Sequence, residues 1–376
     1  MTSRERVMAA VRRRDADYVP CVPHFWSSPV VEGFKWGTEE ERLDVSMNRL
    51  GADAILRFAV GLRWHPDVKT KVWRDQAAGE RYPLIRKEVT TPKGVLSATV
   101  RETEDWPHGL DVPFFSDFNV PRYTKPWLES LEDVEKFAYV YMPPADKEVQ
   151  AARESWGRLC ALRDKFQVAV MGNYATGLTG AIQIFGAQQG VTLSMDHPEV
   201  FERYVEIVHE ADTKCLEILL DLKVDMVRRN GWYESTDFWS LAQFRKYVRP
   251  YMEKEIAMAR QAGCAYNYTM CTGIMPLLPA LVEMRFDSLD TIEPVLGGQD
   301  MARLARDLGR QTCLWGGISA PMHIGESKRE DVRAAVRRAI EVFGKRGFIL
   351  TAVPSIRPHW PWENVMAMLD EWRKVR

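Results

Sequence analysis

The chain of 376 residues carries 51 basic and 52 acidic side chains, and 46% of its residues are apolar. This composition provides a large core and excludes a disordered protein, and the balanced charge without a long basic run argues against nucleic-acid binding. Six scattered cysteines, the lack of a signal peptide and the lack of an apolar run of about 20 residues predict a cytoplasmic protein without a membrane segment.

Capping and turn residues predict the N-terminal elements. Thr2 and Glu5 have the spacing of a capping box, which predicts a helix over residues 3–14. Two runs of alternating apolar and polar residues flank residues 91–94 and predict an antiparallel hairpin. The hairpin belongs to an N-terminal insertion over about residues 61–144, which we expect to lie over one end of the main sheet.

From residue 146 onward, apolar strands alternate with amphipathic helices, which is typical of a parallel sheet covered by helices. Together with two earlier segments, the predicted strands span residues 18–25, 52–60, 166–172, 224–231, 265–271, 286–294, 312–319 and 347–353. This count predicts an α/β fold, a (β/α)8 TIM barrel that forms one domain over residues 1–376. The alternative is an open doubly wound sheet, which would normally carry a glycine-rich phosphate loop after its first strand; none is present there.

Four consecutive predicted strands carry or precede side chains that can bind a metal. The loops after parallel strands gather at one face of a barrel, so we expect these side chains to converge. The candidate ligands are Glu234, Asp237, Cys271, Glu293 and Cys313. Thiolates and carboxylates suit zinc, and a catalytic zinc keeps one position open. Each residue also has a plain alternative, as a solvated or capping carboxylate, a partnered buried acid or a small buried hydrophobe.

Other polar and aromatic side chains are expected near the mouth of the barrel. His323 and Tyr268 are candidate catalytic residues because both can donate a proton. Candidate substrate-binding residues are His24, Asn173, Tyr174, Trp232, Trp315 and His359. The loop histidines can instead be ordinary exposed residues, and most tryptophans are expected to pack in the core.

Several segments resemble the uroporphyrinogen decarboxylase superfamily, especially its corrinoid-dependent methyltransferase branch. They are SRERVMAAVRRRDADYVPCVP, HPEVFERYVEIVHEADTKCLEILL, DFWSLAQFRKYVRPYMEKEI, CTGIMPLLPALVE, LWGGIS, EDVRAAVRRAIEVFGKRGFIL and PWENVMAMLDEW. The resemblance implies a (β/α) barrel. The decarboxylases proper carry an arginine-rich motif after the first strand, where this chain has PHFWSSPVVEGF. A porphyrinogen with four carboxylates is therefore not the expected substrate.

The methyltransferase branch typically binds zinc through a His-x-Cys pair after the fifth strand, a later acid and a later cysteine. Cys271 and Glu293 match two of these positions, whereas Thr269 replaces the histidine and residues 352–355 contain no cysteine. The resemblance implies a zinc-dependent methyltransferase that moves a methyl group from a small compound, such as an aromatic methyl ether, to the cobalt of a corrinoid. The corrinoid would be carried by a separate protein, and we also allow for a homodimer.

Two alternatives stay open at this point. The first is a metal-free decarboxylase or lyase acting on a small carboxylated substrate. The second is a binding protein built on the same barrel, in which the thiols and Glu293 only pack.

Overall fold

The computed structural model describes all 376 residues and has a parallel sheet at its centre. Its seven strands follow one another in the order β1-β6-β7-β8-β9-β10-β11, and all six neighbouring pairs are parallel. They are β1 (Ile55–Ala59), β6 (Ala169–Tyr174), β7 (Met226–Arg229), β8 (Ala265–Thr269), β9 (Ser288–Ile292), β10 (Cys313–Ser319) and β11 (Phe348–Val353). Because the strands are parallel, their C-terminal ends and the loops that follow them share one edge.

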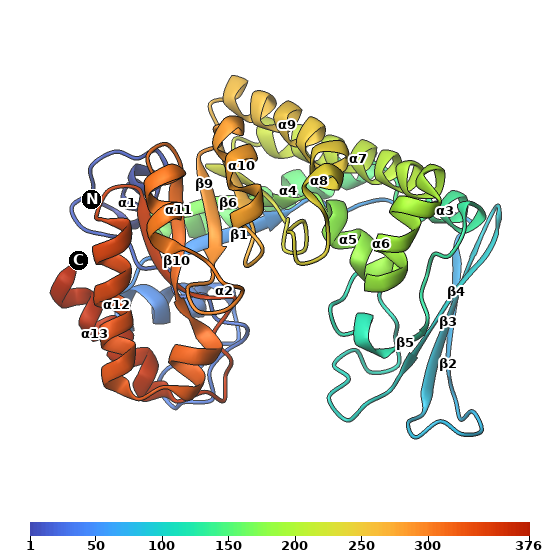
Figure 1. The fold of residues 1–376 in the computed structure, drawn as a ribbon, viewed down its shortest axis with the longest axis horizontal. Coiled ribbons are helices and arrows are strands. Elements are labelled where there is room, and N and C mark those ends of the chain that lie inside the picture. Colours follow the sequence, from blue (N-terminus) through green and yellow to red (C-terminus); the bar gives the residue numbers. More distant parts are fainter.

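Helices connect the strands and cover the outer face of the sheet (Figure 1). The α-helices are α1 (Ser3–Val11), α2 (Glu39–Asp44), α3 (Leu131–Phe137), α4 (Asp146–Phe166), α5 (Gly177–Phe185), α6 (Ala187–Asp196), α7 (Pro198–Asp221), α8 (Leu241–Tyr247), α9 (Arg249–Gln261), α10 (Leu278–Met284), α11 (Met301–Asp307), α12 (Arg329–Phe343) and α13 (Trp362–Val375). Short helical turns are η1 (Val45–Arg49), η2 (Val120–Arg122), η3 (Met275–Leu277) and η4 (Ala320–Glu326).

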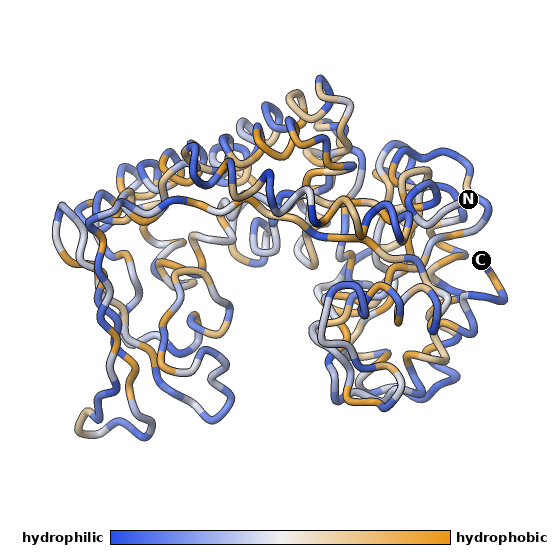
Figure 2. Tube along the Cα trace, turned by 180° about the vertical axis from the view of Figure 1, so that it is seen from behind, coloured by the Kyte–Doolittle hydropathy of each residue, from blue (hydrophilic) through white to orange (hydrophobic).

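Hydrophilic and hydrophobic residues alternate along the long helices α7 and α9, as Figure 2 shows. The apolar positions of such a helix form one stripe, which packs on the sheet while the charged side faces water. None of the helices combines the length and the apolar character needed to span a membrane.

A second, antiparallel sheet has the strand order β2-β3-β4-β5, with β2 (Lys69–Asp75), β3 (Leu84–Thr91), β4 (Gly94–Arg101) and β5 (Tyr123–Lys125). Strands β3 and β4 form the predicted hairpin, in which Thr91 pairs with Gly94. Figure 1 shows this sheet at the end of the molecule far from both termini.

The prediction of a closed eight-stranded barrel is wrong, because one of the eight predicted strands does not form. The parallel sheet curls but contains seven strands, and residues 18–25 form only isolated bridges beside it. Cys21 bridges Leu350 and Phe25 bridges Ile356, both in the parallel sense. The segment therefore occupies the expected eighth position without forming a continuous ladder.

Two prolines explain why the eighth segment does not become a strand. Pro20 and Pro23 have no N–H group, so they cannot complete a ladder of backbone hydrogen bonds. On the side of β1, the Asp53 N–H donates to the Cys21 carbonyl at 2.8 Å. Isolated backbone hydrogen bonds, together with side-chain contacts, therefore hold this part of the chain in place of a continuous ladder.

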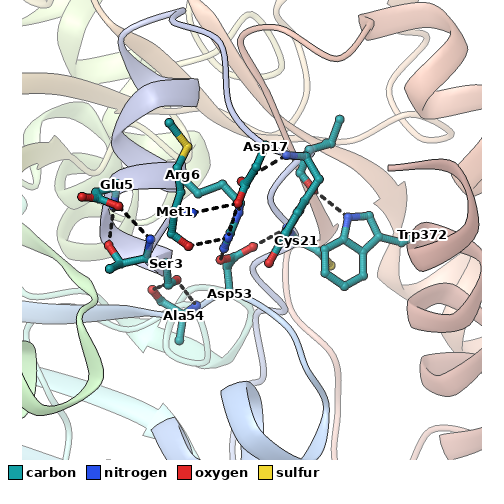
Figure 3. A network of polar contacts seen from close by, with 12 residues as sticks. Met1, Ser3, Glu5, Arg6, Asp17, Cys21, Asp53, Ala54 and Trp372 are labelled. Atoms are coloured by element: carbon teal, nitrogen blue, oxygen red, sulfur yellow. Dashed lines mark hydrogen bonds and ion pairs between the residues drawn. The ribbon is translucent and has the colours of Figure 1, made fainter.

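A buried ionic network fixes the eighth segment between the two ends of the sheet (Figure 3). The guanidinium of Arg6 donates to Asp17 at 2.6 and 2.9 Å and to Asp53 at 2.6 Å. The indole of Trp372 donates to the carbonyl of Val19 at 2.7 Å. Helices α1 and α13 thus anchor the segment that replaces the eighth strand.

The interior of the curled sheet has an apolar layer and a polar layer. Alternate strand residues point inward, so one layer of side chains lies two residues beyond the previous layer. The lower layer is an apolar cluster closed by α1: Val7, Ala10, Val11, Val22, Ile55, Ala169, Met171, Met226, Ala265, Cys313, Trp315 and Ile349. The upper layer, toward the C-terminal ends of the strands, is polar: Arg57, Asn173, Arg228, Asp290 and Thr351.

Candidate functional site

Two adjoining cavities lie at the C-terminal ends of the parallel strands. The larger one, which we call the mouth cavity, has a volume of about 820 Å³. The smaller one, the inner cavity, has a volume of about 280 Å³ and reaches the polar layer inside the sheet. His24, Phe25 and Arg57 line both. The cavities therefore form one candidate site at the position where parallel barrels carry their active sites.

Cys271 lies two residues beyond β8 and lines the mouth cavity together with Asp237. The backbone N–H of Glu293 donates to the carbonyl of Cys271 at 3.2 Å, so the ends of β8 and β9 are adjacent. Burial and, next, the charge of Glu293 raise the pKa of the Cys271 thiol to about 12. The thiol is therefore protonated at neutral pH and acts as a weak hydrogen-bond donor.

The two predicted acids beside Cys271 differ in their surroundings. Glu293 is buried, and one of its oxygens accepts from the N–H groups of Val295 and Leu296 at 2.8 and 3.3 Å. Its Oε2 atom has no hydrogen-bond partner. Asp237 is exposed to the mouth cavity and accepts from the Thr272 hydroxyl at 2.5 Å.

Both carboxylate oxygens of Glu234 accept hydrogen bonds from other parts of the protein, which corrects its prediction as a metal ligand. Its two oxygens accept from Arg229 at 2.9 and 2.7 Å, from the Tyr268 hydroxyl at 2.9 Å and from the Leu178 N–H at 3.0 Å. It is completely buried. A carboxylate with four hydrogen bonds in a closed ion pair has no lone pair free for a metal.

Cys313 lies at the wrong end of its strand to join the other candidates. It is the first residue of β10, completely buried in the lower apolar layer, whereas the mouth is reached beyond Ser319 at the other end. Its position early in the predicted strand already allowed the alternative of a small residue packed in the interior, which is where the structure places it. Burial also raises the pKa of its thiol, as expected for a small core residue.

The predicted zinc ligands do not form a complete set as the structure places them. No three histidine, cysteine or acidic side chains are grouped so that they could hold a metal ion. A catalytic zinc normally uses three protein ligands. Cys271, Asp237 and the unpartnered Oε2 of Glu293 are the donors that come nearest to this requirement. The residues therefore do not fit a resident zinc in this arrangement.

Tyr268 and Tyr174 point away from the cavities, so they are corrected as catalytic and substrate-binding candidates. The Tyr268 hydroxyl donates to Glu234, and the Tyr174 hydroxyl donates to Glu255 of α9 at 2.9 Å. Both side chains lie under the covering helices. The reason is strand parity, because their neighbours Asn173 and Thr269 take the inward positions.

The three candidate histidines are dispersed. His24 lines both cavities, and its Nε2 lies 3.0 Å from a guanidinium nitrogen of Arg57. His323 lies in η4 and accepts from the Ser319 N–H at 3.0 Å beside a separate cavity between α11 and α12. His359 is exposed and packs against Trp360. Only His24 belongs to the site, which corrects the roles expected for the other two.

Three further candidates lie at the cavities. Asn173 lines the mouth cavity, and its side-chain oxygen has no partner. Trp232 lines the same cavity, with the guanidinium carbon of Arg228 lying 5.3 Å from its ring centroid. Trp315 belongs to the lower layer and forms part of the floor of the inner cavity. Their roles in substrate binding remain predictions.

The charged residues of the upper layer were not among the residues predicted for the site. Arg57, Arg228 and Asp290 lie within strands β1, β7 and β9 rather than after them. A charged residue inside an otherwise apolar strand was the available signal, because burial of a charge needs a specific reason. The mouth also receives Asp117 from the segment after β4, where Gln183 of α5 donates to it at 2.7 Å.

Comparisons with known proteins identify the fold and the family. A methyltransferase from Methanosarcina mazei matches with a TM-score of 0.57 and 17% identity, over 100% of this chain and 99% of that chain, which shows a shared fold. A B12-independent methionine synthase from Shewanella sp. W3-18-1 matches with a TM-score of 0.45 and 11% identity, over 95% and 94% of the two chains. No curated protein matches the sequence significantly. The family model described as uroporphyrinogen decarboxylase (URO-D) matches residues 103–375, most of the chain, and the protein therefore belongs to the URO-D family.

Proposed function

We propose that this protein is a methyltransferase-type enzyme that takes a methyl group from a small methylated substrate, such as an aromatic methyl ether, bound in the mouth cavity. The observation that carries the proposal is the placement of the Cys271 thiol and Asp237 in one cavity at the C-terminal ends of the strands. Family membership and the fold shared with a methyltransferase along the whole chain support it.

The residues of the cavity suit a flat substrate. Trp26, Trp232 and Phe238 line it, and aromatic side chains bind planar rings by stacking and edge contacts. A methyl group leaves oxygen only if the negative charge on the departing atom is stabilised. The protonated thiol of Cys271 can donate a hydrogen bond to that atom.

A corrinoid carried by a separate protein supplies the methyl acceptor in this proposal, and that protein docks at the open side of the mouth cavity. Trp26 is 56% exposed at this rim while also lining the cavity, and Arg357 stacks on it at 4.1 Å. A rim with an aromatic and a cationic side chain is typical of a protein-binding surface.

Zinc is a separate proposal, because Cys271, Asp237 and Glu293 would have to move together to bind it. Metal analysis of the purified protein by mass spectrometry tests this point. One zinc per chain, lost in Cys271→Ala but retained in Cys160→Ala on α4, would support it. A metal-free protein that is active would exclude it.

The transferase proposal is tested with a purified corrinoid protein and a panel of methyl ethers. We expect the cobalt absorption spectrum to change as the methyl group arrives and the demethylated product to appear in equal amount. Cys271→Ala should abolish both signals, and Cys160→Ala should leave them unchanged. Full activity of Cys271→Ala would refute the role of this thiol.

A decarboxylase or lyase is the second candidate, and one observation favours it. The upper layer contains the cations Arg57 and Arg228, which suit a carboxylated substrate whichever reaction follows. This candidate predicts release of carbon dioxide without a corrinoid protein, which the same panel of substrates would reveal.

A further inference from the structure

Two arginines face one another in the upper layer of the sheet interior. Arg57 projects from β1 into both cavities, and Arg228 projects from β7 into the mouth cavity. Burial and the charge of Arg228 lower the pKa of Arg57 to about 9, so Arg57 remains protonated at neutral pH. Strands β1 and β7 are separated by β6, on which Asn173 pairs with Arg228 and Met171, two residues earlier, pairs with Arg57.

The charges around these arginines do not balance. Arg57 forms no ion pair with a carboxylate, although Asp290 and Glu39 act on it electrostatically, and its one side-chain hydrogen-bond contact is with the Nε2 of His24 at 3.0 Å. Arg228 has a single acid, Asp290, at 3.5 Å. Burial lowers the pKa of His24 well below its usual value, so this ring is neutral. Glu39 also lines the inner cavity, but both of its oxygens accept from Arg42, at 2.8 and 2.6 Å.

Several hydrogen-bonding groups of this layer also lack partners. Arg228 is only 3% exposed, its Nε donates to Thr269 at 2.5 Å, and its Nη2 donates to nothing. The Thr351 hydroxyl is a second group without a partner, and the side-chain oxygens of Asn173 and Asp290 (Oδ1) are acceptors without a donor. A buried guanidinium with free N–H groups is costly unless a ligand or water completes its hydrogen bonds. Within the upper layer the two arginines therefore outnumber the one acid, Asp290, and the Arg228 Nη2 group and the Thr351 hydroxyl are free to donate to an anion. The carboxylates of Asp117 and Asp237 lie in the mouth cavity outside this layer.

We propose that Arg57 and Arg228 bind the carboxylate of the substrate, a small aromatic acid with one negative charge, where the two cavities join. The inference rests on the proposed function and specifies its substrate class. Guanidinium groups match a carboxylate in shape and bind it through paired hydrogen bonds. A surplus of one charge suits a monoanion, whereas a phosphate dianion would leave an excess negative charge in the layer.

This arrangement orients the rest of the substrate. With its acid group at the inner end, the ring lies in the mouth cavity beside Trp232, which stacks with Arg228. The reacting methyl group then extends toward Cys271 and Asp237 and toward the open side of the cavity. Recognition and reaction thus use different parts of one connected site.

Calorimetric binding to paired ligands tests the proposal without any need for turnover. Benzoate, 3-methoxybenzoate and 4-methoxybenzoate are each compared with the neutral amide of the same shape. We expect at least one acid to bind about tenfold or more tightly than its amide, because the amide cannot make charge-assisted hydrogen bonds at both oxygens. Inorganic phosphate serves as the competing anion and should bind more weakly than that acid.

Variants identify the residues responsible. Arg57→Gln and Arg228→Gln should each weaken binding of the acid by about tenfold or more and leave binding of the amide unchanged. Arg158→Gln, on the exposed face of α4, is the matched control and should bind like the unmodified protein. If Arg228→Gln does not fold, Arg57→Gln carries the test alone.

The outcomes separate this proposal from the proposed function. Equal binding of acids and amides, tighter binding of phosphate, or unchanged binding by the Arg57 variant would overturn the carboxylate site. Methyl transfer from neutral ethers alone would also overturn it while leaving the transferase function intact. Selective binding of acids without methyl transfer would support the carboxylate site and count against the transferase.

Discussion

Replacement of Arg229 by methionine should destabilise the protein strongly, although Arg229 lies far from the proposed chemistry. Its guanidinium donates to Glu234 at 2.9 and 2.7 Å and to Glu255 at 2.8 Å. Glu234 and Glu255 are 0% and 1% exposed. Methionine would leave these two carboxylates buried without a cation, and removal of one partner from a buried ion pair costs about 3–5 kcal/mol.

The adjacent residue on β7 provides the control. Arg228 and Arg229 follow each other on one strand, so they point to opposite faces of the sheet. Arg228→Met should cost clearly less than Arg229→Met, because it leaves one buried carboxylate, Asp290, without a cation rather than two, and because it also removes the repulsion between Arg228 and Arg57. Urea unfolding followed by tryptophan fluorescence measures both variants.

A double variant shows whether the destabilisation by Arg229→Met comes from the carboxylates that it leaves without a cation. Adding Glu234→Gln to Arg229→Met removes one of the stranded carboxylates and should recover at least about 1 kcal/mol relative to the sum of the single changes. If Arg229→Met is as stable as the unmodified protein, or if Arg228→Met loses as much stability as Arg229→Met, the reasoning about the buried ion pair is wrong.

Three further outcomes test the fold. Burial raises the pKa of Asp212 from 3.8 to about 7, so the folded state holds this proton more tightly than the unfolded state. Its contribution to stability is therefore present at low pH and is lost as the pH rises from about 4 to about 7, with a slope of up to about 1.4 kcal/mol per pH unit. In Asp212→Asn, the free energy of unfolding measured with urea should depend less on pH across that range. Gly316→Ala should lower the melting temperature, because a Cβ there would clash with the backbone of Ile292 on β9 at a positive φ of 155°. Thr2→Ala should cost about 1 kcal/mol by removing the N-cap of α1, whereas Thr2→Ser should restore it.

The order of strands and helices could be predicted from the sequence because its signals are local. Seven of the eight predicted segments became strands of the parallel sheet, and the hairpin formed around residues 91–94 as expected. The remaining segment, residues 18–25, has apolar residues in a strand-like pattern. Its two prolines remove N–H groups from the ladder, and this loss decides the outcome.

The site was less predictable because it depends on which face of a strand each residue occupies. A shift of one position exchanges the inside and the outside of the sheet. Tyr268 was chosen for its chemistry, yet Thr269 has the inward position and receives the hydrogen bond from Arg228. Cys271, beyond the end of its strand, was free of this ambiguity, and it does line the mouth cavity.

The two layers inside the curled sheet differ in what they contribute to stability. The lower layer is a complete apolar core, closed by α1, and needs no polar side chain for stability. The burial of Arg57 and Arg228 in the upper layer is a desolvation cost that the folded protein bears. Residues that weaken a fold yet complete a cavity are typical of binding sites, where activity and stability make opposing demands. Arg57 lines both cavities and Arg228 lines the mouth cavity, and this placement is best understood through the ligand that we propose they hold.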